Sequence, residues 1–222
     1  MPVTIDLKDA DATLALGREL ALFAKPGDML ALHGDLGAGK TTLARGLLRA
    51  LMGDEALEVP SPSFALVQAY EAPRFPVAHY AFYRLSSPAE ALETGFQERP
   101  AGEVSIVEWP ERLGPEKPAS RLDVTLDFAN GGRHAVLQGR GGWAARLARF
   151  AAARGFLARE GWGGALRRPL DVDASSRRYE RVALGGRHLI LMDMPTMPDG
   201  PPVRDGRPYS AIVHLAEDIR AV

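Results

Sequence analysis

The sequence has no cysteine, no long apolar run and almost no net charge. The absence of cysteine excludes disulfides and thiolate metal sites. A formal net charge of −1 gives no overall reason to expect affinity for nucleic acids or membranes. No uncharged apolar run approaches the about 20 residues of a membrane helix, and the acidic N-terminal segment lacks the apolar core of a signal peptide. We therefore expect a cytoplasmic protein without membrane association.

Apolar residues are abundant enough for a buried core. They make up 46% of the 222 residues, a length that suits one large domain, or one domain with part of a second. Lysine is absent after Lys117, and arginines outnumber acids between residues 133 and 188. We interpret this excess as a solvated surface, because a nucleic-acid site requires basic residues clustered on one face.

The clearest motif is GDLGAGKT, residues 34–41, which matches the phosphate-binding loop pattern G-x-x-x-x-G-K-[ST]. An apolar segment of strand length, 29–33, precedes the loop, and an amphipathic helical pattern, 41–53, follows it. The glycines allow backbone N–H groups to approach phosphates closely. Lys40 would contact the β- and γ-phosphates, and the Thr41 hydroxyl would ligate Mg²⁺. A tight glycine turn without a ligand is the alternative.

The remaining pattern predicts a P-loop NTPase-like α/β sheet with flanking helices. Further helices are expected at 11–24 and 88–96, and strands at 65–70, 79–85, 104–109, 123–128 and 134–139. Glu108 ends an apolar strand, where a carboxylate beside the loop can hold the metal or orient the attacking water. An exposed acid at a strand end is the alternative interpretation of Glu108.

Several stretches that follow the loop resemble one family when they are taken together. They are SPSFALVQAY (61–70), HYAFYRL (79–85) and VEWPERL (107–113). Their order resembles the TsaE (YjeE) family, bacterial ATPases that assist threonylcarbamoylation of adenosine 37 in tRNA, over roughly residues 3–140. The resemblance implies a domain at 1–142 that binds ATP and Mg²⁺. Its implied partners are TsaD and TsaB, which carry the transfer step, so that contact with tRNA is indirect.

The resemblance also implies roles for individual residues. The phosphates would be wrapped by Gly37, Ala38, Gly39, Lys40, Thr41 and Thr42. Lys40 and Glu108 would be catalytic, and Thr41 and Glu108 would serve the metal. Thr13 is similar to a family position near the nucleotide base, and Arg133 to a nucleotide-contacting arginine.

One position departs from the family pattern. Ala81, in HYAFYR, replaces the aspartate of H-x-D-L-Y-R. Alanine cannot accept a hydrogen bond from a metal-bound water, and losing a group that supports a metal often costs about 10–100-fold in affinity or activity. We therefore expect ATP binding through the loop, with hydrolytic competence in doubt.

Residues 150–222 resemble the opening of aminoglycoside/choline-type phosphotransferases. DASSRRYERV (173–182) would be a nucleotide-covering hairpin, HLILMDMP (188–195) the next strand, and PYSAIVHLAEDIRAV (208–222) the first helix. The catalytic loop of such enzymes has no counterpart here, so we expect an incomplete α+β kinase-like lobe without phosphotransferase activity. Exposed apolar residues are predicted where the missing lobe would pack: Met192, Met194, Ile212 and Val213.

Three functions remain open at this point. The first is an accessory ATPase of tRNA modification. The second is an ATP-dependent scaffold for TsaD and TsaB that has lost turnover through Ala81. The third is a small-molecule P-loop kinase, for which the sequence shows no acceptor-binding signature. Mg²⁺-dependent turnover separates the first two, and a phosphorylated acceptor would indicate the third.

Overall fold

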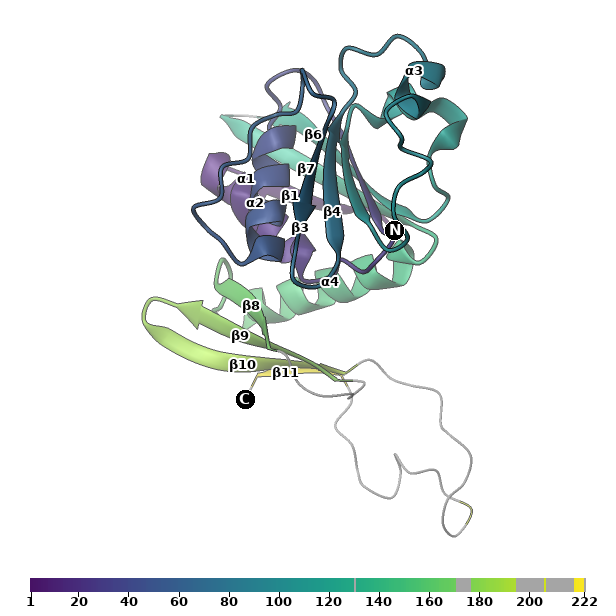
Figure 1. Ribbon diagram of the computed structural model, residues 1–222. Coiled ribbons are helices and arrows are strands. Elements are labelled where there is room, and N and C mark those ends of the chain that lie inside the picture. Colours follow the sequence, from purple (N-terminus) through teal and green to yellow (C-terminus); the bar gives the residue numbers. More distant parts are fainter. Residues whose placement is uncertain (130, 171–176, 195–205, 207–217, 222) are drawn as a thin grey trace. The chain divides into compact units, whose positions relative to one another are not determined.

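A computed structural model describes residues 1–129, 131–170, 177–194, 206 and 218–221 (Figure 1). The chain divides into two compact units, residues 1–150 and 151–222. The division falls within helix α4 (Trp143–Arg159), whose first turns carry Trp143, Leu147 and Phe150 into the core of the first unit. No helix in the part of the chain that the structure describes is long and apolar enough to cross a membrane.

The first unit contains one mixed sheet of seven strands, in the order β1-β7-β6-β2-β5-β4-β3. Strands β6, β2, β5 and β4 run parallel, whereas β3 and β7 form antiparallel hairpins with β4 and β6, and β1 pairs with β7. The strands are β1 (Val3–Leu7), β2 (Met29–His33), β3 (Val67–Glu71), β4 (Pro76–Ala81), β5 (Val104–Glu108), β6 (Arg121–Ala129) and β7 (Gly132–Arg140). The predicted α/β sheet is confirmed.

Helical segments cover the two faces of this sheet. They are α1 (Ala10–Ala21), α2 (Lys40–Met52), α3 (Pro88–Leu92) and the 3₁₀ helix η1 (Pro110–Glu116). Leu16 of α1 and Leu43 of α2 belong to the apolar cluster that contains Ile106 of β5. Tyr80 of β4 packs in the second cluster, with Leu113 of η1. Alternate residues of β2, β4 and β5 thus contribute to opposite layers, as strands buried on both faces require.

Helices α1 and α2 pack so closely that a glycine in each of them has no room for a side chain. A Cβ atom on Gly17 would lie 2.3 Å from the Leu43 carbonyl oxygen, and one on Gly46 would lie 2.1 Å from the Leu14 carbonyl oxygen. Larger residues would separate the helices. Because the phosphate-binding loop leads directly into α2, this contact helps to fix the position of the loop.

Strand β4 begins and ends earlier than the sequence pattern indicates. The strand was predicted at 79–85 but runs from Pro76 to Ala81. Its neighbour β5 ends at Glu108, which pairs with Ala81, so no ladder continues beyond that position. The chain then turns, with the Leu85 N–H donating to the Phe82 carbonyl at 3.0 Å.

The second unit is a four-stranded antiparallel sheet in the order β11-β10-β9-β8. Its strands are β8 (Leu166–Leu170), β9 (Arg178–Leu184), β10 (Arg187–Met194) and β11 (Asp218–Ala221). Val182 and Leu191 form an apolar cluster with Leu157 of α4. The predicted strand at 188–195 is present over the described residues of β10.

Two expectations for this region are wrong. The helix predicted at 208–222 is a strand at 218–221, where the backbone pairs with β10; residues 207–217 and 222 lie outside the described residues. Met192 and Met194 were expected to be exposed but are 8% and 4% exposed. Ile212, Val213 and part of the predicted hairpin at 173–182 lie outside the described residues. The resemblance to phosphotransferases stays a prediction.

Candidate functional site

The loop between β2 and α2 adopts a conformation that favours glycine. Gly34 has φ 132°, and a Cβ atom there would lie 2.3 Å from the Leu126 carbonyl oxygen. Gly39 has φ 106° and is the residue immediately before α2. It has no side chain that could accept a hydrogen bond from the start of the helix. The first backbone N–H groups of α2 therefore have no capping side chain at Gly39, which is the arrangement that binds anions at helix N-termini.

Lys40 extends back across the loop. Its Nζ donates to the carbonyl oxygens of Gly34 at 2.7 Å and Asp35 at 2.8 Å. The ammonium also lies 4.0 Å from the centroid of the Trp109 ring, a cation–π contact. Burial lowers the pKa of Lys40, and this effect is opposed by the nearby carboxylates of Glu108, Glu111 and Asp35.

Thr41 and Glu108 meet although they are 67 residues apart in the sequence. The Thr41 hydroxyl donates to Glu108 Oε1 at 2.8 Å. His79 Nε2 lies 2.9 Å from the same oxygen, and the His79 side chain is completely buried. Glu108 is 4% exposed, so the alternative of an exposed acid at the strand end is wrong. An oxygen-rich pair of a hydroxyl and a carboxylate is the ligand chemistry that Mg²⁺ prefers.

Lys40, Thr41 and Glu108 line a cavity of about 330 Å³ at the N-terminal end of α2. Its wall is formed by Leu36, Gly37, Gly39, Lys40, Thr41, Thr42, Ser61, Ser63, Tyr83, Glu108 and Trp109. Ser61, Ser63, Tyr83 and Trp109 were not predicted as site residues, although the stretches SPSF, HYAFYRL and VEW contain them. Trp109 has φ 62°, which is uncommon for a residue other than glycine, and its ring lies against that of Tyr83 at 5.0 Å between centroids.

Thr13 and Arg133 also reach the loop from separate elements. Arg133 Nη2, from β7, donates to the Gly37 carbonyl oxygen at 3.1 Å. A Cβ atom on Gly39 would lie 3.5 Å from Arg133 Nε and 3.6 Å from Thr13 Cγ2. The Thr13 hydroxyl donates within α1, to the Asp9 carbonyl at 3.1 Å, so Thr13 presents its methyl group to the loop. The predicted nucleotide contacts of both residues stay predictions.

Ala81 lies beside Glu108, its register partner across β4 and β5. Residues paired in this way place their side chains on the same face of the sheet. Ala81 is 1% exposed, so the departure from the family pattern falls next to Glu108 and inside the core. Within the described ranges, no group of three or more histidines or acids could hold a metal ion.

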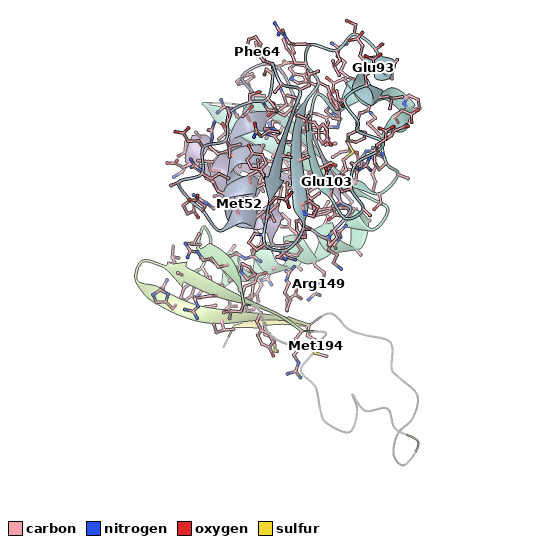
Figure 2. All side chains as sticks on the ribbon, in the orientation of Figure 1. Met52, Phe64, Glu93, Glu103, Arg149 and Met194 are labelled. Carbon is pink, nitrogen blue, oxygen red and sulfur yellow. The ribbon has the colours of Figure 1, made fainter. Side chains whose placement is uncertain are left out.

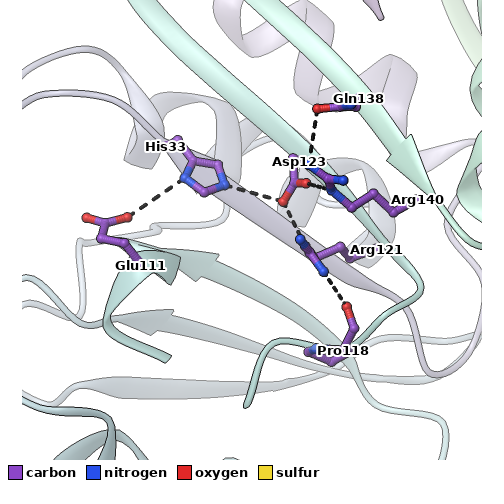
Figure 3. A network of polar contacts seen from close by, with 7 residues as sticks. All are labelled: His33, Glu111, Pro118, Arg121, Asp123, Gln138 and Arg140. Carbon is purple, nitrogen blue, oxygen red and sulfur yellow. Dashed lines mark hydrogen bonds and ion pairs between the residues drawn. The ribbon is translucent and has the colours of Figure 1, made fainter. Parts of the chain in front are cut away.

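A charged network supports the strand that enters the loop (Figure 3). His33, which immediately precedes Gly34, lies 3.3 Å from Asp123 Oδ1 on β6. Asp123 also accepts hydrogen bonds from Arg121 Nε at 2.9 Å and Arg140 Nε at 2.5 Å. The network thus ties the end of β2 to the neighbouring strands on the face opposite α2.

Comparisons with known proteins find relatives of the first unit. Residues 7–135 match the family described as threonylcarbamoyl adenosine biosynthesis protein TsaE. The tRNA threonylcarbamoyladenosine biosynthesis protein TsaE of Rickettsia conorii is 41% identical over 121 residues, covering 54% of this chain and 69% of the relative. The protein of the same name from Bacillus subtilis is 38% identical over 120 residues, covering 54% of this chain and 73% of the relative.

A solved structure has the same fold. The crystal structure of Bacillus subtilis YdiB matches with a TM-score of 0.55 and 27% sequence identity, over 72% of this chain and 97% of that one. The family match begins at the last residue of β1 and ends in β7, so it includes the loop, Glu108 and Arg133. With more than half of its residues inside that match, this chain belongs to the TsaE family.

Proposed function

We propose that the chain binds ATP and Mg²⁺ and hydrolyses ATP as an accessory protein in the synthesis of N6-threonylcarbamoyladenosine at position 37 of tRNA. The observation that carries this proposal is the meeting of Lys40, Thr41 and Glu108 in one cavity at the N-terminus of α2. The names of the relatives supply the pathway. Because tRNA modification requires access to tRNA, the proposed location is the cytoplasm.

The loop residues, Glu108 and Arg133 each have a role in this proposal. Backbone N–H groups of residues 37–42 surround the phosphates, and Lys40 contributes a positive charge. Thr41 and Glu108 hold Mg²⁺, which neutralises charge on the phosphates when bound. The hydroxyl of Thr41 can bind a metal through its oxygen while its hydrogen still reaches Glu108, so the contact seen here is compatible with both tasks. Arg133 contributes a second positive charge at the loop.

TsaD and TsaB are the proposed partners, and they would hold the tRNA. Three large apolar side chains are exposed in or next to the cavity lining: Leu36, at 73%, and Tyr83, at 47%, line the cavity, and Phe64, at 85%, directly follows the lining residue Ser63. Phe64 lies toward one end of the first unit, away from Met52 at the far end of α2 (Figure 2). Exposed apolar groups around a cavity favour contact with another protein there.

A pull-down with TsaD and TsaB tests this surface. Phe64→Ser should weaken retention of the chain by at least about 10-fold, because burial of a phenylalanine side chain contributes about 1.5–3 kcal/mol. Leu166→Ser is the control, since Leu166 is 41% exposed and lies on β8 of the second unit. Equal retention of both variants would contradict the proposed surface.

A second candidate function is an ATP-dependent scaffold without turnover, which the alanine beside Glu108 favours. The deciding experiment measures Mg²⁺-dependent ATP hydrolysis with TsaD and TsaB present, for the native chain and for Ala81→Asp. Clear turnover by the native chain would support the ATPase and show that another group replaces the aspartate. Turnover only after Ala81→Asp would support the scaffold, and no nucleotide binding by either chain would overturn both functions.

A further inference from the structure

We propose that His79 is a positioning residue that sets the orientation of the Glu108 carboxylate toward the cavity. The inference rests on the proposed function, in which Glu108 holds the metal. His79 lies two residues before Ala81 on β4, and its register partner on β5 is Ile106, two residues before Glu108. Side chains two residues apart on a strand share a face, so His79, Ala81 and Glu108 all face α2.

The contacts to Glu108 determine which nitrogen of His79 carries a proton. Glu108 Oε1 accepts the Thr41 hydroxyl at 2.8 Å, and His79 Nε2 lies 2.9 Å from the same oxygen. Because a carboxylate only accepts hydrogen bonds, His79 Nε2 must be the donor. His79 is therefore assigned the Nε2–H tautomer in the unliganded chain.

Both donors act on one oxygen of the carboxylate. Among the described residues, no hydrogen bond to Glu108 goes to Oε2. The two donors come from different elements, Thr41 from α2 and His79 from the sheet, so together they restrict rotation of the carboxylate. Glu108 lines the cavity, and its second oxygen is the one left to contact a metal or a water there. Loss of a group that orients a metal ligand in this way typically lowers metal affinity about 10–100-fold.

A role in packing alone does not account for His79. The residue is completely buried, and its other nitrogen, Nδ1, has no hydrogen-bond partner among the described residues. An unsatisfied polar atom in the core is costly, so an apolar residue would serve packing better at this position. The contact to Glu108 is the feature that an apolar residue could not provide.

The test compares His79→Gln with His79→Asn. The amide nitrogen of glutamine can reach the place of Nε2 and donate to Glu108, whereas the shorter asparagine places its amide near Nδ1. Binding of a fluorescent, non-hydrolysable ATP analogue is titrated with MgCl₂ and repeated in EDTA. We expect His79→Asn to need about 10–100-fold more Mg²⁺ than the native chain, while His79→Gln stays within about threefold. Binding in EDTA should be unchanged in both variants.

His134→Asn is the matched control. His134 lies on β7 and contacts Asp127 at 3.6 Å, so it also pairs with an acid on the sheet but takes no part in the cavity. Its Mg²⁺ requirement should equal that of the native chain. Thermal melting of each variant shows whether the fold is kept, and ¹⁵N resonances of the native imidazole report the tautomer without any substitution.

The possible outcomes separate the two proposals. An unchanged Mg²⁺ requirement in folded His79→Asn, or an Nδ1–H tautomer in the native chain, would overturn the role of His79 and leave the proposed function standing. An equal rise in the Mg²⁺ requirement of the asparagine and glutamine variants would also overturn it, because a hydrogen-bond donor at the position of Nε2 would then make no difference. A native chain that binds the analogue without any response to Mg²⁺ would overturn the proposed metal site and this inference with it.

Discussion

Strand β5 has a buried glutamate at each end, and the two have similar surroundings. Glu103, just before the strand, accepts hydrogen bonds from the Tyr80 hydroxyl at 3.2 Å and the Ser105 hydroxyl at 2.8 Å. Glu108, at its end, is contacted by Thr41 and His79 at 2.8 and 2.9 Å. The two residues are 7% and 4% exposed, so burial and hydrogen bonding alone do not distinguish a functional acid.

The direction of the strand makes the difference. Glu108 lies at the carboxyl end of parallel strands, where α/β sheets place their ligands, and the phosphate-binding loop follows the neighbouring strand β2 at the same edge. Glu103 immediately precedes the first residue of β5, at the amino end of the strand, where the hydroxyl groups of Ser105 on β5 and Tyr80 on β4 donate to it. A buried acid is thus a candidate for chemistry when the topology brings a ligand-binding loop to it.

The largest effect is expected from replacing Lys40, which lies in the cavity at the Glu108 end of β5. We expect Lys40→Ala to weaken ATP affinity about 100-fold, because hydrogen bonds to charged groups contribute about 1.5–3 kcal/mol. Isothermal titration calorimetry measures the affinity. Lys25→Ala removes an exposed lysine outside the cavity and is the control. Equal affinities of the two variants would contradict a phosphate-binding role for Lys40.

Paired substitutions of the two glutamates test the comparison directly. Glu108→Gln should raise the Mg²⁺ concentration needed for half-maximal ATP binding about 10–100-fold, since it removes a charged ligand. Glu103→Gln should leave that concentration unchanged and lower the free energy of unfolding by about 1 kcal/mol, measured with urea. A Mg²⁺ effect of similar size in both variants would remove the distinction drawn here.

A third buried acid, Asp123, makes the stability of the fold depend on pH. Burial alone would raise the pKa of Asp123, but hydrogen bonds from Arg140, Arg121 and His33 outweigh burial and lower it. The unfolded chain therefore takes up this proton at a higher pH, near about 4, and the stabilisation is lost as pH falls from there through the lower folded pKa.

The measurement compares urea unfolding of the native chain and of Asp123→Asn. The native chain should be more stable by about 1–3 kcal/mol at pH 7, and the difference should shrink below about pH 4. A difference that stays constant between pH 7 and pH 3 would show that the network does not favour the charged form of Asp123.

The smallest effect on stability is expected from replacing Tyr80, which donates to Glu103 at the amino end of β5. Burial first, and then the charge of Glu103, raise the pKa of Tyr80. Unfolded tyrosine ionises near about 10, so stability is intact below that pH and falls as pH rises through the range between the unfolded and folded values. Tyr80→Phe should cost about 1 kcal/mol at pH 7 and remove this part of the alkaline loss, as alkaline urea titrations would show. An unchanged alkaline slope would contradict the raised pKa.

Local patterns predicted most of the first unit. The loop motif, the strand at 29–33 and the helix after it depend on residues that are neighbours in the sequence, and the structure has them at nearly the same positions. Glu108 was predicted as a site residue because it ends an apolar run. The end of β4 was predicted four residues too late, because its true end depends on where β5 stops. The strand at 218–221 was missed for a related reason: its pairing with β10 outweighs a helical pattern.

By itself, the sequence determined that a phosphate-binding loop lies between a strand and a helix, because glycine, lysine and threonine at fixed spacing act locally. Only the tertiary structure decided that Glu108 accepts from both Thr41 and His79, and that Trp109 lies against the Lys40 ammonium. These contacts join residues far apart in the chain. Their geometry follows from the parallel pairing of β4, β5 and β2, which no single stretch of sequence specifies.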